Sequence, residues 1–335
     1  MHREKILFVY KEPSTFVKTD RQILAEKYDI TDYCFRPVRG IGKTALEMVK
    51  QFFFLLLIGW KFDKTYIWFA DYHSFLPVWF ARLLGKKSFL VIGGYDICRE
   101  RSLTYGAFCS KFRGFFTAQS IKKATVNLTV SQYVGRKVGF VFPKVKHEMI
   151  YNCINMQTNE NTKQKEKLIL CVALIESQRT FLRKGIDTFL ELAAHVPDYR
   201  LVLIGPNKAA MALFPKPLPE NVSVFERLPH AELASYFEKA SFYCQLSRVE
   251  IFGIAIGEAM LNYCIPLVTN EGGMPEVIGK TGVIVPRNAP KIAEEIRQLE
   301  VMETTAQRKE CRDRILELFS LEQRTKALLT AIEKY

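Results

Sequence analysis

The sequence lacks several patterns that would assign a chemistry directly. It contains no Asp-x-Asp pair, so the closely spaced carboxylates that many enzymes use to hold a divalent metal are missing. It contains no Cys-x-x-Cys pair, and its eight cysteines do not group with its histidines. No Ser, His and Asp order or Cys and His pair supports hydrolysis. We therefore expect no metal ion, no cofactor, and free thiols in a reducing compartment.

Long apolar runs are also missing. Residues 52–60 are apolar, but Lys61 ends the run well short of the ~20 residues that a bilayer-spanning helix needs. At the N-terminus only residues 6–10 form an apolar run, which is too short for a signal peptide and suits a first strand. With 335 residues, of which 48% are hydrophobic and 25% charged, the chain can form two globular domains. We expect a cytoplasmic protein without a membrane span.

Positive charge is abundant and unevenly distributed. The formal net charge is +13, and residues 99–146 hold ten Lys or Arg against one acid, Glu100. Bulky apolar side chains are interleaved with these charges, namely Leu103, Tyr105, Phe108, Phe112, Phe115 and Phe116. This mixture favours peripheral contact with the anionic inner face of the cell membrane. A solvated basic face is the alternative, and a nucleic-acid surface is a weaker one, so we expect no nucleic-acid partner.

Apolar β-rich runs alternate with helical patterns along the whole chain, which predicts an α/β fold with mostly parallel sheets. The expected strands are 6–10, 28–34, 65–69, 88–92, 124–130, 146–151, 168–173, 200–204, 222–225, 241–245, 266–269 and 282–285. The expected helices are 16–27, 43–58, 75–84, an irregular region over 101–123, 132–139, 185–194, 230–239, 254–261, 290–300, 304–319 and 321–334. The polar segment 156–167 is the expected linker between a domain over 1–155 and a domain over 168–320.

The segment from Ser247 to Glu276 has the most specific chemistry. A polar loop ends at Glu250, and Gly253 stands directly before a helix that carries Glu258 in its second turn. The amides at a helix N-terminus favour an anion, and a glycine lets a ligand approach the backbone. Carboxylates accept hydrogen bonds from sugar hydroxyls. A diphosphate with a sugar ring on each side, as in a nucleotide sugar, would satisfy all these groups.

The same segment carries a family resemblance. Glu250-x7-Glu258 is followed by Ala259-Met260, Pro266 and Gly272-Gly273-x-Pro275-Glu276. This series resembles the signature of the retaining glycosyltransferase family 4, the glycosyl transferases group 1. The resemblance implies the GT-B fold, in which two doubly wound Rossmann-like domains face each other across a cleft. It also implies that the last helix, 321–335, returns to the N-terminal, acceptor-binding domain.

The resemblance also implies roles for particular residues of the second half. Arg179-x4-Lys184-Gly185 is similar to the family pattern whose Arg and Lys hold the donor diphosphate. Glu250 would bind hydroxyls of the transferred sugar, and Glu258 would bind the ribose. The backbone at Gly253, Ile254 and Ala255 would meet the phosphates, and the nucleotide base would lie near Leu228. The implied reaction is a metal-independent hexosyl transfer from a nucleoside-diphosphate sugar to an acceptor hydroxyl with retained anomeric configuration.

The first half resembles the family more loosely. The segment Gly93-Gly94-Tyr95-Asp96 follows an expected strand and aligns with a His-Gly-x-Asp pattern, so Gly93 stands where the family has its sugar-contacting histidine. Asp96 is a candidate to bind the acceptor. His73 is a candidate to replace the missing imidazole, although a lone histidine is more often structural. Possible further contacts to the acceptor or the sugar come from Gly94, Ser14 and Thr15.

Three readings of the function therefore remain open. The first is a glycosyltransferase for a glycan or lipid-linked acceptor at the membrane or envelope, which the basic aromatic region 99–146 favours. The second is a nucleotide-sugar epimerase on the same fold, which would need no acceptor. The third is a non-catalytic GT-B scaffold protein, which the substitution at Gly93 suggests.

Overall fold

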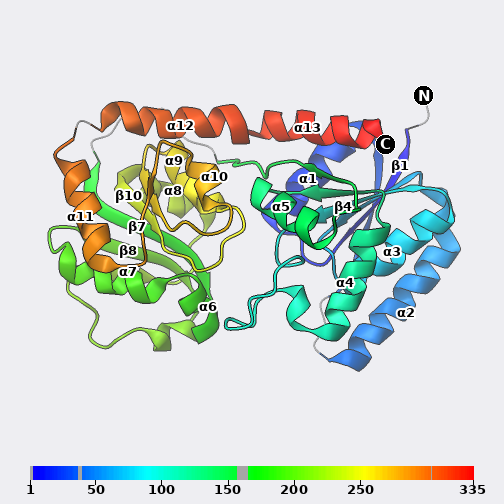
Figure 1. The fold of residues 1–335 in the computed structure, drawn as a ribbon, viewed down its shortest axis with the longest axis horizontal. Helices are drawn as coiled ribbons and strands as arrows, with labels where there is room; N and C mark the ends of the chain where they lie inside the picture. The colour runs from blue at the N-terminus through cyan, green and yellow to red at the C-terminus, as the bar shows by residue number, and fades with distance from the viewer. Residues whose placement is uncertain (1–2, 37–39, 157–164, 303) are drawn as a thin grey trace. The chain divides into compact units, whose positions relative to one another are not determined.

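The computed structural model describes residues 3–36, 40–156, 165–302 and 304–335. The chain divides into two compact units, each built around a six-stranded, fully parallel sheet (Figure 1). The first unit comprises Met1–Asn152 and Glu322–Tyr335, and the second comprises Cys153–Leu321. Most of the expected linker, residues 157–164, lies outside the described residues.

The first sheet has the strand order β2-β1-β3-β4-β5-β6. Its strands are β1 (Lys5–Tyr10), β2 (Asp29–Cys34), β3 (Lys64–Trp68), β4 (Lys87–Ile92), β5 (Val126–Thr129) and β6 (His147–Met149). Its helices are α1 (Thr15–Lys27), α2 (Ile41–Ile58), α3 (Tyr72–Leu83), α4 (Lys111–Lys123), α5 (Gln132–Val141) and the C-terminal α13 (Leu321–Lys334). Helices α1 and α13 lie on one side of the sheet, and α2, α3 and α4 lie on the other (Figure 1).

The second sheet has the order β12-β11-β10-β7-β8-β9. Its strands are β7 (Glu166–Ile175), β8 (Arg200–Pro206), β9 (Val222–Phe225), β10 (Ala240–Gln245), β11 (Ile265–Val268) and β12 (Val283–Ile284). Its helices are α6 (Gln178–Arg183), α7 (Ile186–Leu192), α8 (His230–Lys239), α9 (Ile254–Leu261), α10 (Met274–Ile278), α11 (Ala289–Glu300) and α12 (Thr305–Phe319). Apolar side chains of α7 and α11 pack with those of the strands into one hydrophobic core.

Central strands are buried on both faces, so their polar residues, such as Asn127 and Ser241, are buried together with the apolar ones. All residues of β5 and of β10 are buried. Parallel sheets need helices on both faces because their crossover connections run there, so no face of a central strand meets water. In β7 and β8 the sequence signal is therefore a nearly continuous apolar run rather than an alternating pattern, and it located these strands to within a few residues.

The last helix is fixed to the first unit by a buried ion pair. The guanidinium of Arg324 on α13 donates to both carboxylate oxygens of Asp20 on α1, at 2.6 and 2.7 Å. The hydroxyl of Tyr66 and the indole nitrogen of Trp68 donate to the same carboxylate, at 2.6 and 2.9 Å. Neither charge is exposed to water, so the charges are matched by each other and by these hydrogen bonds. The helix thus packs on the first unit, as the resemblance implied.

Two short helices were missing from the sequence prediction. Helix α6 begins after Ser177, whose hydroxyl accepts a hydrogen bond from the backbone amide of Thr180 at 3.3 Å. Helix α10 begins after Gly273, with Pro275 in its first turn. Lys184 follows Arg183 as the C-cap residue of α6, and Gly185 is the N-cap residue of α7. Strand β7 also begins at Glu166, inside the expected linker.

Candidate functional site

The site in the second unit lies where the strand order of the sheet reverses. Strand β7 pairs with β8 on one side and with β10 on the other. In doubly wound sheets the loops at such a point diverge, and ligands bind outside the carboxyl ends of the strands there. The connection from β7 to α7 carries Lys184, and the loop after β10 carries Glu250. The topology therefore brings together two residues that are 66 positions apart in the sequence.

Lys184 and Glu250 are in direct contact. The Lys184 ammonium donates to Oε2 of Glu250 at 2.6 Å, and the side-chain amide of Gln245 donates to the same oxygen at 2.6 Å. The two charged side chains are only 15% and 14% exposed. Burial alone would raise the pKa of Glu250, but the charge and hydrogen bond of Lys184 outweigh it and lower this pKa. Glu250 is therefore an ionised acceptor held in a fixed position.

Glycines keep the Glu250 loop in place by allowing close backbone contacts. A Cβ built on Gly272, where φ is 66°, would overlap the carbonyl oxygen of Glu250. A Cβ on Gly273 would overlap the carbonyl of Ile251 in the same way. On the other side, Gly185 at φ 70° lies against the carbonyl of Leu246. The glycines of both motifs therefore clamp the loop between residues 246 and 251.

A second ion pair ties this loop to α7, and the sequence analysis gave it no role. The two terminal nitrogens of Arg248 donate to the two carboxylate oxygens of Asp187, at 2.9 and 2.6 Å. The backbone amide of Arg248 donates to the carbonyl of Arg183 at 2.8 Å. The sequence signal for this pair is the opposite charge of Arg248 and Asp187, which lie in two segments that follow neighbouring strands. This pair positions the loops that carry Lys184 and Glu250.

Helix α9 presents its N-terminus beside Glu250. Gly253 has a left-handed conformation with φ 98°, and its carbonyl accepts from the amides of Ile256 and Gly257. The preceding first-turn amides of Ile254 and Ala255 have no carbonyl within the helix to pair with. Both residues are partly exposed, whereas Glu258 one turn later is only 9% exposed.

The remaining predicted donor residues lie on separate elements. Arg179 is exposed on α6, five residues before Lys184. Leu228 is partly exposed in the loop between β9 and α8. The structure thus brings Lys184 and Glu250 into contact and places Arg179 on the same connection as Lys184. Within the described part of the chain, no group of three or more His, Cys, Asp or Glu residues is arranged to hold a metal ion.

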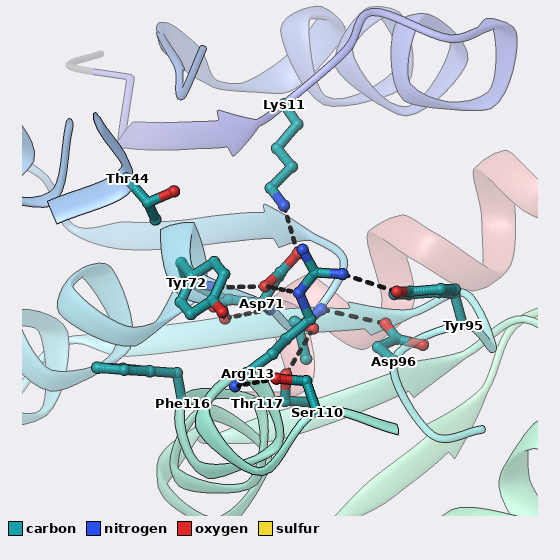
Figure 2. A network of polar contacts seen from close by, with 12 residues as sticks. Lys11, Thr44, Asp71, Tyr72, Tyr95, Asp96, Ser110, Arg113, Phe116 and Thr117 are labelled. Carbon is teal, nitrogen blue, oxygen red and sulfur yellow. Dashed lines mark hydrogen bonds and ion pairs between the residues drawn. The ribbon is translucent and has the colours of Figure 1, made fainter. Parts of the chain in front are cut away.

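The first unit has a corresponding charged cluster at its own reversal point. Strand β1 pairs with both β2 and β3, and the residues that follow β1 and β3 include Lys11 and Asp71. Lys11 donates to the Asp71 carboxylate, and Arg113 of α4 approaches the same carboxylate at 3.4 Å (Figure 2). Arg113 also donates to the hydroxyl of Tyr95 at 2.7 Å and lies over the ring of Tyr72. Two cations therefore share one carboxylate.

The structure explains why position 93 holds a glycine. A Cβ built on Gly93 would overlap the ring of Phe69, so this ring fills the space that a side chain at position 93 would need. The carboxylate of Asp96, which is 1% exposed, accepts hydrogen bonds from the amides of Ala70 and Gly93 at 3.1 Å and of Gly94 at 2.6 Å. Burial raises the pKa of Asp96 to about 6. These bonds fix the turn after β4.

Other candidates in the first unit point away from solvent or lie at a helix start. The His73 ring is fully buried, with Nε2 at 2.8 Å from the carbonyl oxygen of Trp68, and burial lowers its pKa to about 4. This imidazole would have to leave the core to meet a sugar. Ser14 is the N-cap residue of α1, and Thr15 is exposed in the first turn of that helix. The Ser14 hydroxyl is buried and has no hydrogen-bond partner in the part of the chain that the structure describes.

Comparisons with known proteins concern the family and the fold. Residues 155–315 match the model of the family "Glycosyl transferases group 1". An uncharacterized 41.2 kDa protein in the cps region of Klebsiella pneumoniae is 33% identical over 158 residues, which are 42% of this chain and 42% of that protein. The chain spans about half the length of the curated relatives it matches.

Solved structures match over nearly the whole chain. Sucrose-phosphate synthase from Thermosynechococcus elongatus matches with a TM-score of 0.77 at 15% identity, covering 99% of each chain. HepE from Anabaena, in complex with UDP and glucose, matches with a TM-score of 0.74 at 13% identity, covering 99% of this chain and all of the other. The predicted α/β fold with two doubly wound units is thereby confirmed. The chain therefore has the two-domain GT-B fold, and its second unit carries a match to the glycosyl transferases group 1 family.

Proposed function

We propose that this protein is a retaining glycosyltransferase that moves a sugar from a nucleoside-diphosphate sugar to an acceptor hydroxyl. The observation that carries the proposal is the contact of Lys184 with Glu250, at the reversal point of a sheet whose sequence matches the glycosyl transferases group 1 family. An ammonium beside an ionised carboxylate suits a ligand that has a phosphate next to sugar hydroxyls. The complex of HepE with UDP and glucose is compatible with such a donor.

The proposed mechanism assigns a role to each group. The glycosidic bond to the diphosphate breaks while the acceptor oxygen bonds to the same carbon, and the acceptor proton passes to the departing phosphate. Lys184, Arg179 and the free amides at the start of α9 stabilise the charge that grows on the leaving diphosphate. In this proposal they do so without a metal ion. Glu250 orients the sugar by accepting from its hydroxyls, and Glu258 binds the ribose.

We place the acceptor at the carboxyl ends of β1, β3 and β4 in the first unit. Lys11 and Arg113 share the single carboxylate of Asp71, which leaves one positive charge in excess. The rings of Tyr72 and Tyr95 flank Arg113, with centroids 5.4 and 5.9 Å from its guanidinium carbon. Aromatic faces beside a cation suit a glycan that carries a negative group.

We further propose that the enzyme works in the cytoplasm, beside the inner face of the cell membrane. Its eight cysteines are all free, which suits a reducing compartment. Of the aromatic residues in the basic region 99–146, Phe112 and Phe115 on α4 and Phe140 on α5 are more than half exposed. These three rings and the lysines of the region support a lipid-linked or envelope glycan as the acceptor.

A thermal-shift screen against nucleotide sugars tests the donor site first. A ligand that binds only the folded state raises the melting temperature, so one nucleotide sugar should stabilise the wild-type protein more than Glu250→Gln. Product analysis with that donor then separates the reactions. Transfer requires an added acceptor, whereas an epimerase converts the free nucleotide sugar alone. No stabilisation by any nucleotide sugar would contradict the proposal.

A further inference from the structure

Helix α2 exposes most of its large apolar side chains, although Leu55 is buried. A surface helix normally turns its apolar stripe toward the core. In α2 the fully buried positions include Gln51, whose side chain donates to the carbonyl of His73 at 2.9 Å. Leu57 is 69% exposed, and Trp60 just beyond the helix is 61% exposed. The exposed large apolar residues of this helix and its end are Leu46, Val49, Phe52, Phe53, Leu56, Leu57 and Trp60.

The exposed apolar surface continues onto α3. Figure 1 shows α2, α3 and α4 side by side on one face of the first sheet. Phe52 of α2 and Phe80 of α3 are in contact, with ring centroids 5.7 Å apart. Leu83 and Leu84 at the carboxyl end of α3 are 74% and 43% exposed. A continuous exposed apolar surface of this kind marks a protein or membrane contact rather than ordinary protein surface.

A strongly basic hollow adjoins the exposed end of α3. It has a volume of about 380 Å³ and lies where α3 and α4 end and β4, β5 and β6 begin. Its other lining residues are apolar or small, and no carboxylate lines it within the described residues. Asp63 lies nearby and pairs with Lys86 at 3.6 Å. The seven cations that line the hollow are Arg82, Lys86, Lys87, Lys122, Lys123, Lys144 and Lys146.

We propose that this face of the first unit docks on an anionic phospholipid bilayer, with α2 lying in the plane of the membrane. The apolar face of α2 would enter the acyl boundary, and the basic hollow would receive lipid phosphates. Residues 41–62 carry Lys43, Lys50 and Lys61 against the single acid Glu47, so charge favours an anionic surface. A second copy of the chain is a poor occupant because two basic hollows brought together would repel each other.

This surface overlaps the basic region 99–146 only in the hollow, where Lys122, Lys123, Lys144 and Lys146 belong to that region. Helix α2 lies outside it, and the apolar run over residues 52–60 is too short to span a bilayer. No described helix is both long and apolar enough to cross a membrane. A helix that lies flat needs no such length, because only one face has to be apolar.

The test is flotation of the full chain with vesicles of phosphatidylcholine alone and of phosphatidylcholine mixed with phosphatidylglycerol. The double variant Phe53→Glu with Leu57→Glu removes apolar contacts and adds charge, and it should lower partitioning by about 100-fold or more. The control Val301→Glu changes an 87% exposed residue of the second unit and should bind like the wild type. Equal binding of the double variant and the wild type would overturn the proposal.

A second pair of variants tests the hollow. Lys122→Ala with Lys144→Ala should weaken binding to the anionic vesicles by about 25-fold and leave binding to neutral vesicles unchanged. Lys280→Ala with Lys309→Ala removes two exposed cations of the second unit and should have little effect. If inorganic phosphate binds the hollow as tightly as anionic vesicles do, the hollow is a site for free phosphate and the lipid assignment fails.

Two further measurements make the result independent of catalysis. Doxyl-labelled lipid should quench the fluorescence of Trp60, and Trp60→Phe should remove this quenching while Trp68 and Trp79 remain. Analytical ultracentrifugation without lipid should find a monomer. If the wild type were a dimer and the double variant Phe53→Glu with Leu57→Glu a monomer, a second copy would cover α2. This outcome would overturn the proposal.

Discussion

The Lys184 ammonium lies 2.6 Å from the Glu250 carboxylate, across the point at which the strand order of the second sheet reverses. Lys11 and Asp71 form the same kind of pair at the reversal point of the first sheet. Lys11 and Lys184 follow β1 and β7, the first strand of each unit. Asp71 and Glu250 follow β3 and β10, the strands that pair with β1 and β7 across the reversal points. The first unit differs in having the additional cation Arg113, which gives its cluster an excess positive charge.

Glu250→Gln tests the role of the carboxylate in the proposed donor site. The amide keeps the size of the side chain but removes the charge that Lys184 contacts and an acceptor for sugar hydroxyls. We expect kcat/KM to fall by about 100-fold or more, with the far-ultraviolet circular dichroism unchanged. Glu294→Gln changes an exposed acid on α11 and serves as the control. Wild-type turnover in the Glu250 variant would support a non-catalytic scaffold instead.

Arg113→Gln tests the proposed role of Lys11, Asp71 and Arg113 in binding the acceptor. Loss of the guanidinium removes the excess positive charge beside Asp71 and the hydrogen bond to Tyr95. We expect the KM for an anionic acceptor to rise by about 10-fold or more while the Kd of the nucleotide donor stays the same. Arg101→Gln, at an exposed position of the same basic region, is the matched control. A change in donor affinity alone would contradict this assignment.

Gly272→Ala tests the clamp on the Glu250 loop. The new methyl group would overlap the carbonyl of Glu250, and the residue has φ 66°, which alanine adopts poorly. We expect the free energy of unfolding to fall by about 3 kcal/mol or more in urea denaturation. Gly42→Ala on α2 meets no atom within 4 Å and should be neutral or stabilising by up to about 1 kcal/mol. Equal stability of the two variants would rule out the clamp.

Arg324→Met tests the anchor of α13. The substitution leaves the buried Asp20 carboxylate without its counter-charge, so we expect a loss of about 3–5 kcal/mol in the free energy of unfolding. Hydrogen exchange of the α13 amides should accelerate. Adding Asp20→Asn should recover part of the loss, because the unpaired charge is then gone. Lys326→Met, at an exposed position of the same helix, should change little.

His73→Gln tests the burial of the imidazole. The pKa of His73 is about 4 in the folded protein and about 6.5 in an unfolded chain. Between these two pH values the unfolded chain binds more protons at this residue than the folded protein does. The contribution of His73 to the free energy of unfolding is therefore complete above about pH 6.5 and is lost as the pH falls toward 4. The stability advantage of the wild type over the variant should shrink by about 3 kcal/mol from pH 6.5 to pH 4. Urea denaturation across this range measures it.

Asp96 makes the opposite contribution over nearly the same range. Its pKa is raised to about 6, so the folded protein holds a proton that the unfolded chain has already released. Stability from this group therefore falls as the pH rises from about 4 to about 6. Because the His73→Gln comparison leaves Asp96 in both proteins, its contribution cancels in the difference. If the difference in the free energy of unfolding between the wild type and His73→Gln did not change with pH, the His73 imidazole would be exposed in solution.

Local patterns in the sequence were sufficient to locate the sheets. Strand β9 and helices α8, α9 and α13 begin and end where the hydrophobic pattern predicted. Motif spacing also selected Lys184 and Glu250, because both belong to segments with a clear family pattern. The short helices α6 and α10 escaped prediction because their five or six residues are too few to establish a helical period.

The sequence by itself determined the α/β class, the order of the elements and the identity of Lys184 and Glu250 as charged residues of the candidate site, because these depend on local periodicity and spacing. Tertiary structure decided which long-range partners meet. It paired Arg248 with Asp187 and Arg324 with Asp20, and it put the Phe69 ring where a side chain at Gly93 would lie. It also decided that α2 turns its apolar face outward, since burial depends on what the rest of the chain packs against a helix, and no local pattern contains that information.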